Sequence, residues 1–110
     1  MLRSQLLKGT VTFLVLSVLD EGELYGYQIA RRIRDRSGAY LSPSEGSLYP
    51  ALHALERDGA IVAEWRASDR GARRRYYRLT PTGSRLLADS RGDWEAFARA
   101  VSTVAGGAGS

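Results

Sequence analysis

The sequence predicts a mainly α fold with a small β-hairpin, in the order helix, helix, helix, hairpin, long helix. Three observations predict it. Residues 47–59 have the pattern of a short amphipathic helix that a glycine ends, and residues 66–78 carry many arginines between two strand-like segments. Residues 81–104 carry apolar side chains at heptad spacing. Together they predict a winged helix-turn-helix in residues 1–80, a C-terminal dimerisation helix in residues 81–104, and a disordered tail in residues 105–110.

Composition excludes several functional classes. The chain has 110 residues, no cysteine and a single histidine, His53. A disulfide framework and a Cys/His zinc site within one chain are therefore excluded. No set of nucleophile, base and acid is present, so we expect neither an enzyme nor a cofactor or metal site. The absence of cysteine fits a reducing cytoplasm, where we expect the protein.

Positive charge is concentrated in one segment. Residues 66–78 contain six arginines against Asp69, a net +5 in a chain whose total is +4. A charge run of this kind is either a solvated loop or a surface that faces phosphates. Its place between two strand-like segments favours the phosphate surface.

The first predicted helix spans residues 3–19 and is apolar on most of its surface. Arg3 and Lys8 before this stretch resemble the start of a secretory signal, but no cleavage site follows. Thr12 and Ser17 interrupt the apolar run, which is also too short to span a bilayer. We therefore expect a core helix, no membrane association, and Leu6 close to a dimer interface.

The second predicted helix opens at Tyr25 and continues to about Asp35. Ile29 and Ile33 lie one turn apart and are expected to face the core. Arginines occupy its other sides and its last turn, where cations suit the helix dipole. Ser37 and the glycine that follows it end the helix.

The third predicted helix carries Leu48, Leu52 and Leu55 on one apolar stripe and ends before Gly59. Pro50 leaves two possible beginnings. If Ser47 is the N-cap, Pro50 lies in the first turn, where its missing N–H costs little. If the helix starts at Ser44, Pro50 lies deeper and should tighten or kink the opening turn.

Residues 61–65 and 75–79 are rich in strand-forming side chains, and residues 67–72 between them contain turn formers. We expect an antiparallel hairpin. Tyr77 and Leu79 share one face of the second strand, and Tyr76 and Arg78 share the other.

The last helix begins after Thr80, with a proline at its first position. Its heptad pattern comprises Leu87, Ser90, Trp94, Phe97, Val101 and Val104. These side chains pack either on their own domain or on a second copy of the chain. The second copy is favoured, because a lone helix cannot hide them. The expected dimer contacts are Leu6, Leu87, Trp94, Phe97, Val101 and Val104.

Three segments in this order closely resemble the PadR family of bacterial transcriptional regulators. They are Gly-Tyr-Gln-Ile at 26–29, Gly-Ser-Leu-Tyr-Pro-Ala-Leu at 46–52 with Leu-Glu-Arg-Asp-Gly at 55–59, and Arg-Arg-Tyr-Tyr-Arg-Leu-Thr-Pro-Thr-Gly at 74–83. The resemblance covers roughly residues 5–90, and the single C-terminal helix is similar to the shorter subfamily. It implies a homodimer, usually a repressor, that binds a palindromic operator through the third helix and the hairpin wing. Some members release DNA on binding a flat aromatic effector between tryptophans of the C-terminal helix, which makes Trp94 a candidate ligand contact.

The candidate DNA contacts come from three places. They are Tyr27 and Gln28 in the second helix, Ser44, Ser47, Tyr49 and His53 in or before the third, and Arg70, Gly71, Arg73 and Arg74 at the wing tip. Tyr27 could instead pack in the core, and His53 could instead be an ordinary surface residue without a DNA contact. Arg75 and Arg78 are expected to pair with acids instead.

The third helix has few side chains that read bases, so specificity is expected from hydroxyls, His53 and DNA shape. The competing interpretation is a winged-helix module that binds protein or a ligand without sequence-specific DNA binding. The arginine cluster argues against it.

Overall fold

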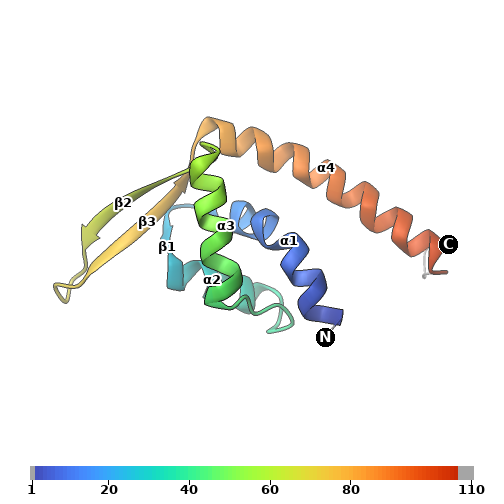
Figure 1. The fold of residues 1–110 in the computed structure, drawn as a ribbon, viewed down its shortest axis with the longest axis horizontal. Helices are drawn as coiled ribbons and strands as arrows, with labels where there is room; N and C mark the ends of the chain where they lie inside the picture. Colours follow the sequence, from blue (N-terminus) through green and yellow to red (C-terminus); the bar gives the residue numbers. More distant parts are fainter. Residues whose placement is uncertain (1, 107–110) are drawn as a thin grey trace.

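The computed structural model describes residues 2–106, with side chains from residue 10 onward (Figure 1). Four helices and three short strands follow the predicted order, and the fold class is confirmed. The elements are α1 (Leu2–Leu19), β1 (Leu24–Tyr25), α2 (Gly26–Arg36), α3 (Glu45–Arg57), β2 (Ile61–Ala67), β3 (Arg73–Leu79) and α4 (Pro81–Val104).

The three strands form one antiparallel sheet in the order β1-β3-β2. The hairpin register runs from Ile61 opposite Leu79 to Ala67 opposite Arg73. Strand β1 was not predicted: Tyr25 pairs with Tyr76 and is the N-cap of α2 rather than its first residue. The hairpin therefore has a short third strand at its base and projects from the body beyond it (Figure 1).

The core lies where α1, α2 and α3 meet the base of the sheet. The predicted apolar stripes of α2 and α3 are buried, including Ile29 and Leu52 at 0 % exposure. Tyr77 contributes from β3, and its burial raises the pKa of its hydroxyl. Among the described residues, no helix combines the length and the apolar content that crossing a bilayer requires.

Helix α3 begins at Glu45 with Ser44 as its N-cap, the second of the two predicted beginnings. Pro50 therefore lies inside the helix, where its missing N–H leaves one backbone bond unmade. The helix still continues to Arg57. Gly59 follows it with φ +76°, a left-handed conformation that favours glycine after a helix end.

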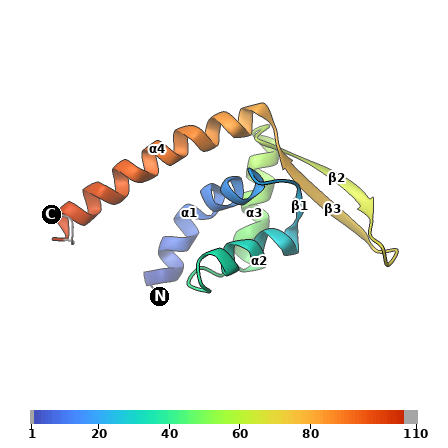
Figure 2. The same cartoon turned by 180° about the vertical axis from the view of Figure 1, so that it is seen from behind.

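Helix α4 leaves the hairpin through a tight junction. Thr80 is the N-cap: its Oγ1 accepts a hydrogen bond from the Gly83 N–H at 3.1 Å and donates one to the Gly59 carbonyl at 2.6 Å. The Thr80 N–H also donates to the Ala60 carbonyl. From this anchor α4 runs over α1 and away from the hairpin (Figure 2).

The heptad pattern of α4 is divided between two environments. Leu87 is 2 % exposed and packs into the core of its own chain, so the prediction that it contacts a second copy is wrong. Further along, large apolar side chains are exposed: Trp94, Phe97, Val101 and Val104. The Leu6 side chain and residues 107–110 of the predicted tail lie outside the described part of the chain.

Candidate nucleic-acid interface

An open groove of about 430 Å³ lies between the start of α2, helix α3 and the hairpin. It brings together five of the predicted DNA contacts: Tyr27, Tyr49, His53, Arg73 and Arg74. Its other lining residues are Tyr25, Gly26, Trp65, Arg75 and Tyr77. The groove is thus aromatic along its floor and cationic along the wing, a combination suited to a polyanion with flat bases and sugars.

Two of the three arginines predicted at the wing, Arg73 and Arg74, project from opposite faces of β3, because successive side chains of a strand alternate. The Arg73 guanidinium lies 5.6 Å from the ring centre of Trp65. The Arg74 guanidinium lies 4.5 Å from that of Tyr25. Each cation is therefore held over an aromatic ring at a separate edge of the groove.

Ion pairs remove two arginines from the positive run. Arg66 binds both carboxylate oxygens of Glu23, at 2.5 and 2.6 Å, and also contacts Glu64. The hydrogen bond from Arg66 lowers the pKa of Glu23, and the pair raises the pKa of Arg66 in turn. Arg75 contacts Glu56 at 2.6 Å, which confirms its predicted pairing with an acid.

The positive charge that remains is concentrated toward the tip of the wing. Arg70, Arg73 and Arg74 make no ion pair with another described residue. Arg78 is exposed at the base of the hairpin, where its charge helps to lower the pKa of Glu23. Arg78 makes no ion pair with a described residue, contrary to its predicted pairing with an acid. The unpaired cations of the hairpin are therefore the three toward the tip and Arg78 at the base.

Two residues of α2 have different roles. Tyr27 is 62 % exposed and accepts a hydrogen bond from Arg31, so the core-packing alternative is wrong. Gln28 is partly buried, and its Oε1 accepts a hydrogen bond from the Tyr25 N–H at 3.1 Å. The Gln28 carbonyl oxygen thus caps the start of α2.

The predicted contacts of α3 are separated along the helix. Ser44 and Ser47 lie at its N-terminus, outside the groove, and the Ser47 hydroxyl donates to the Ser44 carbonyl. Tyr49 lines the groove and packs on Gly26, where a Cβ atom would lie 2.9 Å from its hydroxyl oxygen. His53 is exposed one turn later and also lines the groove.

Arg70 and Gly71 lie at the hairpin tip, beyond the groove. Gly71 has φ +83°, and its N–H donates to the Ser68 carbonyl. Its place in this turn requires a left-handed backbone, so glycine is explained there by conformation alone.

Sequence reasoning missed Tyr25 and Trp65 as groove residues. Trp65 is 54 % exposed and lies opposite Arg75 in the hairpin register. Strand alternation could have placed it on the same face as Arg75 and Tyr77. Tyr25 could not be found in this way, because its position depends on β1 pairing with β3.

A second surface joins α1 and α4. The ring centres of Phe13 and Trp94 are 6.2 Å apart, and those of Trp94 and Phe97 are 6.1 Å apart. An open hollow of about 380 Å³ beside these rings is also lined by Thr10, Ser90 and Asp93. Helix α1 and the far end of α4 lie on the opposite side of the molecule from the hairpin (Figure 1).

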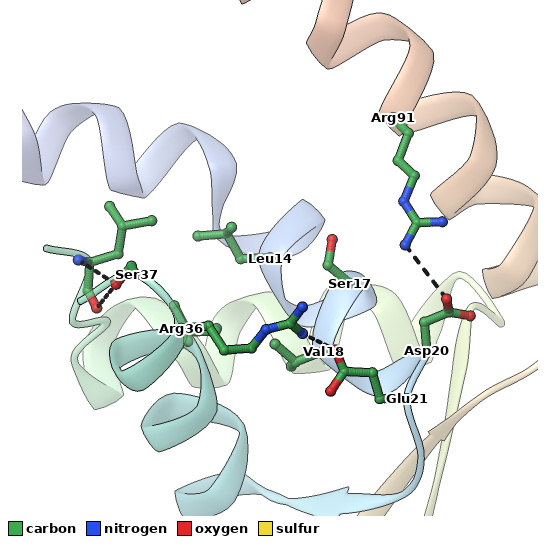
Figure 3. Close-up of a pocket in the computed structure, with 10 residues that line it drawn as sticks. Leu14, Ser17, Val18, Asp20, Glu21, Arg36, Ser37 and Arg91 are labelled. Atoms are coloured by element: carbon green, nitrogen blue, oxygen red, sulfur yellow. Dashed lines mark hydrogen bonds and ion pairs between the residues drawn. The ribbon is translucent and has the colours of Figure 1, made fainter. Parts of the chain in front are cut away.

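A third hollow, of about 340 Å³, lies between α1, the end of α2 and α4 (Figure 3). Its rim carries two ion-paired acids: Glu21 pairs with Arg36, and Asp20 pairs with Arg91 of α4 at 3.5 Å. With Glu23 bound to Arg66, each acid of the turn after α1 has an arginine partner. Among the described residues no three acidic or histidine side chains gather as metal ligands.

Comparison with known proteins agrees with this geometry. Residues 15–89 match the model of the transcriptional regulator PadR-like family. The chain is 38% identical over 94 residues to the transcriptional regulator Rv3488 of Mycobacterium tuberculosis, which covers 86% of this chain and 84% of that protein. It is also 29% identical over 77 residues to the negative transcriptional regulator PadR of Bacillus subtilis, covering 70% of this chain and 42% of that one.

A solved transcriptional regulator from Clostridium thermocellum superposes with a TM-score of 0.82 at 31% identity, covering 90% of this chain and 96% of that one. The family model spans more than half of the chain and coincides with the helices and hairpin that form the groove. This protein is therefore a member of the PadR-like family of transcriptional regulators, which are regulators rather than enzymes.

Proposed function

We propose that the protein is a homodimeric repressor that binds a palindromic operator through α3 and the arginine-rich wing. The observation that carries this proposal is the groove, in which aromatic and imidazole side chains of α2 and α3 face arginines of the wing. The Bacillus subtilis relative is a negative transcriptional regulator, which supports repression rather than activation.

Affinity in this proposal comes mainly from the wing. Arg70, Arg73 and Arg74 are exposed or half-exposed, carry no ion pair among the described residues, and neutralise phosphates. Ser44 and Ser47 add hydroxyls at the N-terminus of α3, where backbone N–H groups also favour an anion. Base reading is left to Tyr49 and His53 and to the shape of the duplex.

Two-fold symmetry in the operator requires two copies of this groove. The exposed apolar side chains of α4, namely Trp94, Phe97, Val101 and Val104, supply a surface for a second copy. A dimer joined through α4 presents two recognition helices to half-sites about one helical turn, roughly 34 Å, apart. The aromatic surface around Phe13 and Trp94 is the place where a flat aromatic effector would bind.

A gel-shift titration with the DNA upstream of the protein's own gene tests the proposal. We expect salt-sensitive and sequence-selective retardation by the intact chain. The double variant Arg73→Ala/Arg74→Ala is expected to bind all sequences more weakly. In a plot of log affinity against log salt concentration, the slope for this variant should become less steep by about 0.9 for each phosphate that it no longer neutralises.

The matched control is Arg34→Ala/Arg85→Ala, which removes the same charge from the end of α2 and the start of α4. We expect this control to keep most of the affinity and the salt slope. Equal affinity and slope for wild type and the wing variant would exclude the wing from the DNA interface. Absence of retardation by the intact chain at low salt would favour a module that binds protein or ligand without sequence-specific DNA binding.

A further inference from the structure

We propose that Glu56 and Arg75 are positioning residues that fix the wing against α3, so that selective DNA binding depends on an acidic side chain close to the DNA. The proposal rests on the proposed function and adds to it a determinant of specificity. Neither residue is among the contacts expected to touch DNA.

The pair begins a continuous series of contacts that ends at a DNA-facing cation. Glu56 on α3 contacts Arg75 on β3 at 2.6 Å. The Arg75 guanidinium lies 5.8 Å from the ring centre of Trp65, and Arg73 lies 5.6 Å from the same ring. The position of Arg73 is thus linked through Trp65 and Arg75 to the recognition helix.

Within the described part of the chain this is the one ion pair that joins α3 to the hairpin. Its side chains are 37% and 30% exposed, and the Arg75 Nε is buried without a hydrogen-bond partner. Arg75 lies opposite Trp65, one residue beyond the part of β3 that pairs with β1, so the ion pair ties the hairpin to α3 where the outer part of the wing begins. A small change of angle at this point displaces the tip, where the proposed phosphate contacts are.

Two possible roles for Glu56 predict opposite changes in affinity for the selected DNA sequence when the charge of Glu56 is removed. If Glu56 acts only as a negative charge near DNA, its loss strengthens binding to every duplex alike. If it positions the wing, its loss strengthens non-selective binding, because Arg75 becomes a free cation, but weakens binding to the selected sequence. The ratio of the two affinities separates the roles.

The experiment uses the full chain and two probes: a duplex selected by the wild-type chain from a random pool, and a scrambled duplex of the same composition. For Glu56→Gln we expect the affinity for the scrambled duplex to rise by about twofold at low salt, because the Arg75 guanidinium is no longer paired and can neutralise a phosphate. We expect selected-duplex affinity to fall by about tenfold, as for a coupled network that loses one partner. The control Asp69→Asn removes one charge from the wing tip without breaking an inter-element pair and should raise both affinities equally.

The exchanged variant Glu56→Arg/Arg75→Glu restores an ion pair at the same place and should recover part of the selectivity, the remainder being lost with the contact of Arg75 to Trp65. Thermal denaturation establishes that every variant is folded at the assay temperature. An unchanged ratio in folded Glu56→Gln, or an exchanged variant as unselective as Glu56→Gln, would overturn the positioning role. A wild-type chain that selects no duplex from the pool refutes the proposed function instead, so the two failures are distinguishable.

Discussion

At Gly83, α4 packs closely against the backbone of Ala60. A Cβ atom built on it would lie 2.0 Å from the Ala60 carbonyl oxygen, a distance that only a shift of backbone could relieve. That carbonyl also accepts the hydrogen bond of the Thr80 N–H. The glycine is therefore required by close packing and not by its own backbone angles.

Substituting this glycine tests the junction. We expect Gly83→Ala to lower the free energy of unfolding by about 2–4 kcal/mol, because the added methyl group forces α4 away from Ala60. Gly92→Ala on the same helix is the control: a Cβ there meets nothing within 4 Å. This control should stabilise the protein by about 0.5–1 kcal/mol, since alanine favours the helix. Urea denaturation measures both, and a stable Gly83→Ala would contradict the close approach.

The structural role of a residue could be predicted only where it follows from a local sequence pattern. The exposed position of His53 and the turn at Gly71 follow from helix and hairpin patterns. The role of Gln28 does not, because it depends on strand β1, and the place of Trp65 follows from strand alternation only once the register of β2 with β3 is known. The charge that the wing presents could also be predicted only in part. The run of arginines is visible in the sequence, but Glu23, which pairs with Arg66, lies far away in the chain.

At the scale of elements, the pair between Glu23 and Arg66 attaches the segment before β1 to the hairpin. Both carboxylate oxygens accept hydrogen bonds from one guanidinium, a geometry that favours the ionised acid. The pKa of Glu23 is accordingly lower in the folded chain than its ordinary value of 4.5. Folding is therefore linked to the charge of this side chain.

The linkage predicts the direction of a pH effect. Because the folded-state pKa is depressed, the stabilisation is fully present above the ordinary pKa and is lost as pH falls through the folded value. We expect Glu23→Gln to be less stable than wild type at pH 7 and the difference to shrink steadily below about pH 4.5. Thermal denaturation from pH 7 to pH 3 measures it. The control Glu95→Gln on α4 should match wild type throughout, and a pH-independent gap for Glu23→Gln would contradict the linkage.

Helices were predicted more completely than strands for a physical reason. Long apolar periodicity determines α2, α3 and α4, and the buried stripes of α2 and α3 lie where expected. Strand β1 has only Leu24 and Tyr25, too few residues for an alternation to show. The beginning of α3 was left open between two caps, because Pro50 is compatible with either until packing selects one.

At the scale of the whole molecule, the exposed end of α4 is suited to a partner. Trp94, Phe97, Val101 and Val104 are 42 %, 61 %, 48 % and 90 % exposed on one helix. An apolar series of this kind on a small domain is typical of an interface. The heptad spacing predicted the apolar series but not which members are buried within the chain and which are exposed. Leu87 has the same spacing as the others, yet it is buried in the core of its own chain.

Removing the largest of these side chains tests the interface. We expect Trp94→Ala to weaken dimerisation by about tenfold or more, or to weaken binding of flat aromatic compounds, because it removes the ring between Phe13 and Phe97. Analytical ultracentrifugation and fluorescence titration measure the two properties. Leu86→Ala, a partly exposed apolar side chain of α4 outside the heptad series, is the control and should keep both. A folded Trp94→Ala that also keeps both would remove the main residue of the proposed interface.

The tight seat of α4 at Gly83 has a consequence for the spacing of DNA sites. From Leu87 to Val104 the helix extends about 25 Å at 1.5 Å per residue. Beyond the junction, Arg91 pairs with Asp20 and Trp94 packs near Phe13 of α1, so α4 is positioned by its own domain. In the proposed dimer, a tilt of α4 by a few degrees at the Gly83 junction moves the two DNA-binding domains by ångströms relative to each other. If the chain forms the proposed dimer, the close packing of Gly83 against the Ala60 carbonyl oxygen sets the direction of α4 and, with it, the half-site separation that the dimer accepts.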